Sequence, residues 1–127
     1  MRILELNHIA LHVRDVEKSC EFYARVLQLQ PLPRPAFDFP GAWFRLGAHQ
    51  ELHIIGERKE PVLSQNRGNH FALQAEDLQP WLEHFQNLGL PLRGPVRRPD
   101  GATQVFLKDV DGHVVELFTP PPRGKEC

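Results

Sequence analysis

Apolar and polar residues alternate over residues 6–13 with the two-residue period of a half-buried β-strand, which places His8 and His12 on the same face. The apolar spacing then becomes that of an amphipathic helix, predicted over 16–28 with Asp15 as its N-cap. A run of prolines ends this helix. The pattern that follows predicts three short strands, at 37–39, 42–46 and 50–55.

The second half of the chain repeats the first at an offset of 62 residues. Residues 7–16 and 69–78 share Asn-His, an apolar residue, Ala-Leu, three variable residues, Asp and an apolar residue. The repeat predicts a strand, a helix and three more strands, at 69–75, 78–88, 91–96, 103–108 and 113–118. Asp77 is expected to cap the helix, Gly89 to end it, and residues 109–112 to form a tight turn.

These elements predict an α+β fold built from two tandem βαβββ modules. The modules cover about 4–56 and 68–119, with a charged and polar linker at 57–67. We expect them to form a curved mixed sheet with both helices outside. A chain of 127 residues is long enough for one hydrophobic core, so residues 1–127 are expected to be a single domain.

Charge and composition exclude several classes of partner. The formal net charge is −1, which gives no reason to expect a nucleic acid or an anionic membrane as partner. No apolar run approaches the length of a membrane span, and the N-terminus lacks a signal-peptide core. The two cysteines, Cys20 and Cys127, cannot form a disulfide framework. This usage favours a reducing, cytoplasmic location and a small molecule as the partner.

Four polar residues on different strands are candidates for one site. His8 and His70 occupy duplicated positions, and Glu116 is a carboxylate inside an apolar run, where an unpaired charge is costly. The interval from His70 to Glu116 is 46 residues, compared with 45 from His8 to His53 and 43 from His8 to Glu51. The spacing favours His53 as the counterpart of Glu116 and leaves Glu51 open.

Three imidazoles and one carboxylate suit Zn²⁺, Ni²⁺, Mn²⁺ or Fe²⁺ and do not suit Ca²⁺. His8, His70 and Glu116 alone would form a two-histidine, one-carboxylate pattern, which leaves coordination positions open for a substrate. The alternative is structural, because a single histidine on a strand is more often a structural residue than a ligand.

The Asn-His-Ile-Ala-Leu and Asn-His-Phe-Ala-Leu openings resemble those of the vicinal oxygen chelate superfamily, as does the closing Asp-Val-Asp-Gly-His-Val-Val-Glu-Leu. This superfamily includes glyoxalase I, fosfomycin-resistance thiol transferases, extradiol dioxygenases and bleomycin-binding proteins. The resemblance covers residues 4–119 and implies a glyoxalase-like member with one divalent metal. It implies that the ligands are His8, His70 and Glu116, with His53 or Glu51 at a position that glyoxalases fill with Glu or Gln.

The resemblance also implies a mechanism. The metal chelates two adjacent oxygens of the substrate, and a carboxylate moves a proton next to the polarised carbonyl. Glu116 is the first candidate base and Glu51 the second. We expect the substrate-binding residues to be His12, Phe39, Trp43, Arg45 and Arg97. Open sheet edges, and the dimers that relatives form, favour a homodimer.

Three functions fit this reading. The first is a metal-dependent lyase, isomerase or thiol transferase that acts on a small oxygenated substrate. The second is a metal-free protein that sequesters a ligand, as bleomycin-resistance proteins do. An extradiol dioxygenase ranks third, because such enzymes usually need a longer chain. The histidines and glutamate in register favour an enzyme, and fold alone does not decide the substrate.

Overall fold

The computed structural model describes residues 1–122, and the chain divides into two compact units, Met1–Pro61 and Val62–Cys127. The division falls inside the expected linker. Each unit has the predicted order of one strand, one helix and three strands, so the α+β assignment and the two βαβββ modules are confirmed. The single domain and the homodimer stay predictions.

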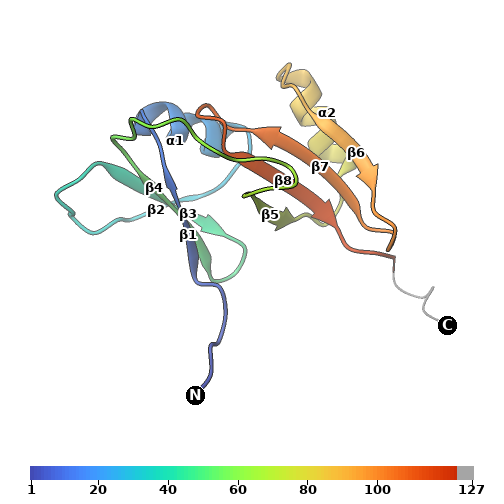
Figure 1. Cartoon of the computed structure of the whole chain (residues 1–127), viewed down its shortest axis with the longest axis horizontal. Helices are drawn as coiled ribbons and strands as arrows, with labels where there is room; N and C mark the ends of the chain where they lie inside the picture. The colour runs from blue at the N-terminus through green and yellow to red at the C-terminus, as the bar shows by residue number, and fades with distance from the viewer. Residues whose placement is uncertain (123–127) are drawn as a thin grey trace. The chain divides into compact units, whose positions relative to one another are not determined.

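The first unit is a four-stranded mixed sheet with one helix (Figure 1). Its elements are β1 (His8–His12), α1 (Val16–Arg25), β2 (Pro31–Leu32), β3 (Gly41–Leu46) and β4 (Gln50–Ile55). The strand order is β1-β4-β3-β2, with β1 parallel to β4 and the other pairs antiparallel. Phe44, Leu52 and Ile54 are almost fully buried on the face against α1. The opposite, open face carries the polar side chains.

The second unit repeats this arrangement (Figure 1). Its elements are β5 (Phe71–Gln74), α2 (Gln79–Asn87), β6 (Arg93–Arg97), β7 (Thr103–Lys108) and β8 (Val114–Thr119). The strand order is β5-β8-β7-β6, with β5 parallel to β8. Val105, Val115 and Leu117 bury one face, and Phe85 of α2 is fully buried. The turn before β8 closes at Gly112 with φ of 98°, as the sequence predicts.

The prediction of a strand at 37–39 is wrong. Phe37 and Phe39 stack with ring centroids 5.1 Å apart, and the Arg34 guanidinium lies 4.8 Å from each ring. The edge of β3 pairs instead with Pro31–Leu32. The alternation of this segment therefore reflects an aromatic cluster in a loop and not a pleated strand.

Both helices are shorter than predicted, and their N-terminal caps differ. The Asp15 Oδ1 atom accepts hydrogen bonds from the backbone N–H groups of Glu17 (3.0 Å) and Lys18 (3.3 Å), so α1 has the expected cap. At α2 the N-cap position is Leu78, and Asp77 one residue earlier accepts from the Gln79 N–H. Within residues 1–122, no helix is long and apolar enough to span a membrane.

Replacing Asp15 with Ala should lower the free energy of unfolding by about 1 kcal/mol, because two backbone N–H groups of α1 lose their acceptor. Urea titration monitored by circular dichroism measures the change. Asp15→Asn is the matched control and should cost much less, since Asn caps helices about as well as Asp. An equal loss in both variants would mean that the charge, and not the cap, is what stabilises the helix.

Candidate metal centre

Strand register determines which polar residues of the first unit share the open face. His8 lies opposite Glu51, and Ala10 lies opposite His53. In the second unit Ala72 lies opposite Glu116. Because Ala10 and Ala72 are equivalent in the repeat, the residue equivalent to Glu116 is His53 and not Glu51. The structure thus answers the question of register that spacing alone left open.

His53 is held between two flat rings on this face. Trp43 stacks on one side at 4.1 Å between centroids, nearly parallel at 5°, and His8 stacks on the other at 4.1 Å and 17°. The His53 Nε2 atom is 3.0 Å from the Glu51 Oε1 atom. A histidine whose second nitrogen bonds a carboxylate is typical of metal-site histidines, because the bond orients the ring. Glu51 therefore orients the His53 ring through this hydrogen bond.

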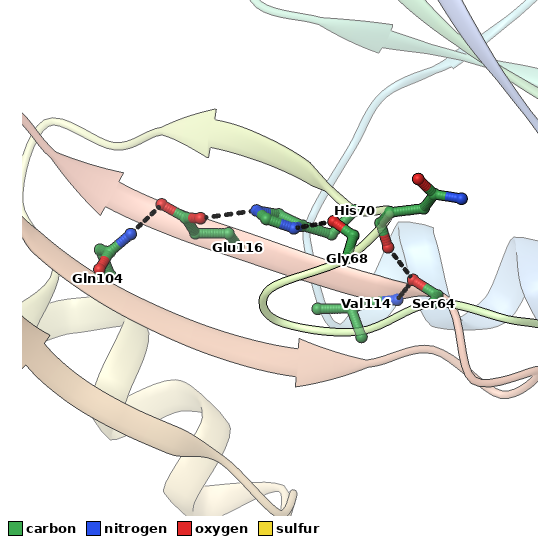
Figure 2. Close-up of polar contacts among 7 residues, drawn as sticks. Ser64, Gly68, His70, Gln104, Val114 and Glu116 are labelled. Atoms are coloured by element: carbon green, nitrogen blue, oxygen red, sulfur yellow. Dashed lines mark hydrogen bonds and ion pairs between the residues drawn. The ribbon is translucent and has the colours of Figure 1, made fainter.

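In the second unit, His70 and Glu116 are brought together from positions 46 residues apart (Figure 2). The His70 Nε2 atom lies 3.0 Å from the Glu116 Oε1 atom, and the His70 Nδ1 atom lies 3.1 Å from the Gly68 carbonyl oxygen. The Glu116 side chain is only 6% exposed. Its other oxygen, Oε2, accepts a hydrogen bond of 3.1 Å from the Gln104 amide. The buried carboxylate in the apolar strand thus has two polar partners.

The two duplicated histidines have similar surroundings at Nδ1. The His8 Nδ1 atom is 2.9 Å from the Asn7 side-chain oxygen, and the His70 Nδ1 atom is 3.1 Å from the Gly68 carbonyl oxygen. A neutral imidazole carries one N–H, so donation from Nδ1 leaves a lone pair on Nε2. We assign this tautomer from the hydrogen bonds around each ring. In this tautomer each histidine can bind a cation through Nε2, although the His70 Nε2 atom also faces the Glu116 carboxylate.

Each compact unit brings together its own candidate ligands. The structure brings His70 together with Glu116, and His8 together with His53 and Glu51. Within residues 1–122, no group of three or more His, Cys, Asp or Glu side chains lies close enough to hold a metal. The two sets belong to different compact units, so the complete ligand set stays a prediction.

The candidate substrate residues have different surroundings. Trp43 lies on the open face against His53, and Arg45 lies opposite Glu51 in register. Phe39 is 38% exposed in the aromatic cluster. The His12 Nε2 atom is 2.9 Å from the Gly56 carbonyl oxygen, which is a structural contact. Arg97 pairs with Thr103, and this register places it on the opposite face from Glu116.

Arg98, which follows Arg97, is held by a carboxylate. Its guanidinium donates to both carboxylate oxygens of Asp100. This hydrogen bonding raises the pKa of Arg98 and lowers the pKa of Asp100. Arg98 is therefore engaged within its own turn.

Gln104 is a neighbour of the candidate ligand Glu116 that the sequence pattern does not reveal. It lies on β7, two residues before Phe106, and Phe106 pairs with Glu116 across the sheet. Alternation along β7 was visible in the sequence, but the pairing of β7 with β8 has to be known before Gln104 can be placed beside Glu116. The ring of Phe106 also meets His70 edge-on at 5.8 Å between centroids.

Comparison with known proteins gives a family match over most of the chain. The model of the Glyoxalase/Bleomycin resistance protein/Dioxygenase superfamily matches residues 5–117. The metallothiol transferase FosB of Bacillus licheniformis is 27% identical over 123 residues, which cover 93% of this chain and 77% of that protein. The lactoylglutathione lyase of Pseudomonas putida is 26% identical over 149 residues, covering 91% and 85% respectively.

A solved structure supports the fold. A mutant of the fosfomycin resistance protein FosX from Listeria monocytogenes, in complex with Mn(II) and 1S,2S-dihydroxypropylphosphonic acid, superposes with a TM-score of 0.77. It is 23% identical and the match covers 94% of both chains. At this identity the likeness shows a common fold.

Proposed function

This chain belongs to the Glyoxalase/Bleomycin resistance protein/Dioxygenase superfamily, and on that premise we propose that it is a metal-dependent enzyme acting on a small oxygenated substrate. The names of its relatives support metal dependence, since FosB is a metallothiol transferase and the FosX structure contains Mn(II). They also indicate the range of chemistry, from lyase to thiol transfer.

The contact between His70 and Glu116 carries this proposal. Both ring nitrogens of His70 face oxygen acceptors, Nδ1 the Gly68 carbonyl and Nε2 the Glu116 carboxylate. A neutral imidazole can donate to only one of them. A cation shared between the Nε2 atom and the carboxylate would satisfy the nitrogen that carries no proton. A buried carboxylate without such compensation would be costly.

We propose that the ligands are His8, His53, His70 and Glu116, and that Zn²⁺, Ni²⁺, Mn²⁺ or Fe²⁺ binds them. Nitrogen and carboxylate donors together suit these ions and do not suit Ca²⁺. The hydrogen bonds at the far side of three of these rings support the assignment, because ligating histidines usually donate their second N–H to an oxygen. Glu51 then orients His53 from outside the ligand set.

When bound, a divalent metal at this centre supplies Lewis-acid polarisation of two adjacent substrate oxygens. The residues of the chain handle the proton. Glu116 is the proposed base, because its burial and its two hydrogen-bonding partners hold the carboxylate in one position. Gln104 would hold the Oε2 atom of Glu116 in place through its hydrogen bond. The Oε1 atom, which contacts His70, would then accept the proton of the substrate. Glu51, which is 25% exposed beside His53, is the second candidate.

The open face of the first unit supplies the proposed substrate contacts. Trp43 offers a flat apolar surface next to His53. Phe39 stacks on Phe37, whose ring centroid lies 6.2 Å from that of Trp43. Arg45 on β3 pairs with Glu51 on β4 and offers a positive charge to an anionic group of the substrate. Two of the expected substrate-binding residues lie elsewhere. His12 contacts the Gly56 carbonyl oxygen, and the register of Arg97 places it on the face opposite Glu116.

Metal content and turnover test this function together. The full chain, purified without chelator or a metal-affinity tag, should carry about one equivalent of metal by plasma mass spectrometry. In D₂O, S-lactoylglutathione should gain deuterium next to its carbonyl if the chemistry is of the lyase type. If the protein instead consumes an added thiol such as glutathione only when fosfomycin is present, the chemistry is thiol transfer.

The control is protein treated with a chelator and dialysed, which should lose turnover and regain it when the metal is returned. A chain that binds no metal even after titration contradicts the proposal and favours a ligand-sequestering protein. A chain that binds metal but turns over neither substrate would leave the metal centre standing and exclude the two reactions.

A further inference from the structure

Three rings are stacked in a row on the open face of the first unit. His53 lies in the middle, with Trp43 on one side and His8 on the other, and both centroid distances are 4.1 Å. The interplanar angles of 5° and 17° make the three rings nearly parallel. The indole of Trp43 offers no lone pair to a metal, so the proposed ligand set gives no reason for its stack on His53.

Trp43 is fixed by the sheet around it. It pairs with Leu32 of β2 on one side and with His53 of β4 on the other, so β3 lies inside the sheet. Directly opposite residues of antiparallel strands have Cβ atoms about 4.5–5.5 Å apart, close enough for two flat side chains to stack. The ring of Phe37 lies beside Trp43, with 6.2 Å between centroids.

The loop that carries Phe37 is held by its own contacts. Phe37 stacks on Phe39, and the Arg34 guanidinium lies 4.8 Å from both ring centroids. The Arg34 Nη2 atom also donates to the Phe39 carbonyl oxygen at 3.0 Å. Gly41 leaves room for this guanidinium, because a Cβ atom there would lie 2.9 Å from the Arg34 Nη2 atom. The loop therefore gives the Trp43 ring a fixed neighbour.

His53 is held more firmly than His8. The His53 ring lies between two others, its Nε2 atom is 3.0 Å from the Glu51 Oε1 atom, and its side chain is 15% exposed. His8 is an exposed residue on β1, at one end of the strand order of its sheet. Within residues 1–122, the His8 ring hydrogen-bonds the neighbouring Asn7 side chain alone. His8 is therefore the histidine that can turn.

The two stacked histidines cannot both bind one ion in this arrangement. The lone pair of an imidazole nitrogen lies in the plane of its ring, so a bound metal lies in that plane, about 2.0–2.1 Å from the nitrogen. The stacked rings of His8 and His53 occupy separate, nearly parallel planes, which share no point at that distance. Joint binding therefore requires one ring to turn, and the contacts of the two rings make it His8.

We propose that Trp43 is a positioning residue for the proposed ligand His53. Because the His53 Nε2 atom faces Glu51, the N–H is assigned to Nε2 and the lone pair to Nδ1. Trp43 keeps the plane of this ring, and hence the direction of the Nδ1 lone pair, while His8 leaves the stack to bind the same ion. The assignment rests on the proposed function and adds to it a residue that does not touch the metal.

Zinc titration of the full chain against a chromophoric chelator tests this role. In Trp43→Leu the zinc affinity should fall roughly 2- to 10-fold, the change that corresponds to the loss of one stacked aromatic pair. Trp43→Phe keeps a flat ring and should recover most of the affinity. The matched control is Trp81→Leu, the same change on α2, which should bind zinc as the parent does. Equal loss in both leucine variants would overturn the proposal.

A double-mutant cycle shows whether Trp43 acts through His53. In a His53→Ala background, Trp43→Leu should cause no further loss of zinc affinity, because the ring that Trp43 positions is absent. An equal loss in both backgrounds would overturn the proposal, since Trp43 would then act on the fold as a whole. Trp43 is also a proposed substrate contact, but the titrations contain no substrate, so that role does not enter the comparison.

The ring C–H resonances of the histidines, observed by NMR, report which ring turns. In the metal-free parent, the ring currents of the two neighbouring rings should shift the His53 signals upfield. On saturation with zinc, the His8 signals should change as this ring leaves the stack. The His53 signals should keep the part of their shift that comes from Trp43, which the spectrum of Trp43→Leu identifies. Loss of that part on zinc binding would overturn the proposal.

The zinc titrations also separate this proposal from the proposed function. A parent that binds no zinc contradicts the proposed function and the positioning role together. A parent that binds zinc, with unchanged affinity in Trp43→Leu, contradicts the positioning role alone and leaves the metal centre standing.

Discussion

Replacing Glu116 with Gln should lower the affinity of the chain for a divalent metal by at least about 100-fold. Substitution of outer partners of metal ligands costs about 10- to 100-fold, and loss of a charged ligand should cost at least the upper end of that range. Gln has the same shape and can still hydrogen-bond Gln104 and His70, so the fold should be kept. Titration against a chromophoric chelator measures the affinity.

His70→Ala should produce a comparable loss, because it removes the imidazole that faces the same carboxylate. The matched control is Glu76→Gln, an exposed glutamate in the same unit, which should bind metal as the parent does. If Glu116→Gln and His70→Ala both bind metal as tightly as the parent, the proposed ligand set is wrong. The two side chains would then form a hydrogen-bonded pair with a structural role.

The largest loss of stability is expected from Phe85→Ala. Phe85 is the one buried residue of α2, is fully inaccessible to solvent, and packs near the rings of Trp81 and His84. Removing its ring should lower the free energy of unfolding by about 3–5 kcal/mol, from lost burial and the cavity left behind. This is a large part of the total stability of about 5–15 kcal/mol that domains possess.

Urea denaturation of both proteins measures this difference. Phe37→Ala makes the same chemical change at a side chain that is 46% exposed and should cost about 1.5 kcal/mol or less. Similar losses at the two positions would mean that α2 contributes little to the core of the second unit. Two separate transitions would show that the two compact units unfold independently.

Several elements could be predicted because their signals are local. The alternation around His8, the capping residue Asp15 and the glycine at 112 each act within a few residues of themselves. The error at residues 37–39 shows the limit of such signals. Two alternating phenylalanines look the same in a strand and in a loop where they stack under Arg34. Only the pairing of β3 with β2 distinguishes the two cases.

The sequence by itself determined the duplication, the fold class and the residues most in need of a polar partner. His8 and His70 repeat at an offset of 62, and Glu116 lies in an apolar run, and these facts depend on order along the chain alone. The tertiary structure decided register and neighbourhood. It made His53 the equivalent of Glu116 and placed Gln104 beside that carboxylate. The physical reason is that the alternation of side chains is set within a strand, whereas strand pairing is set by contacts between residues distant in sequence. A single bulge, such as the one between Arg93 and Val96, also changes which face of the sheet a residue occupies.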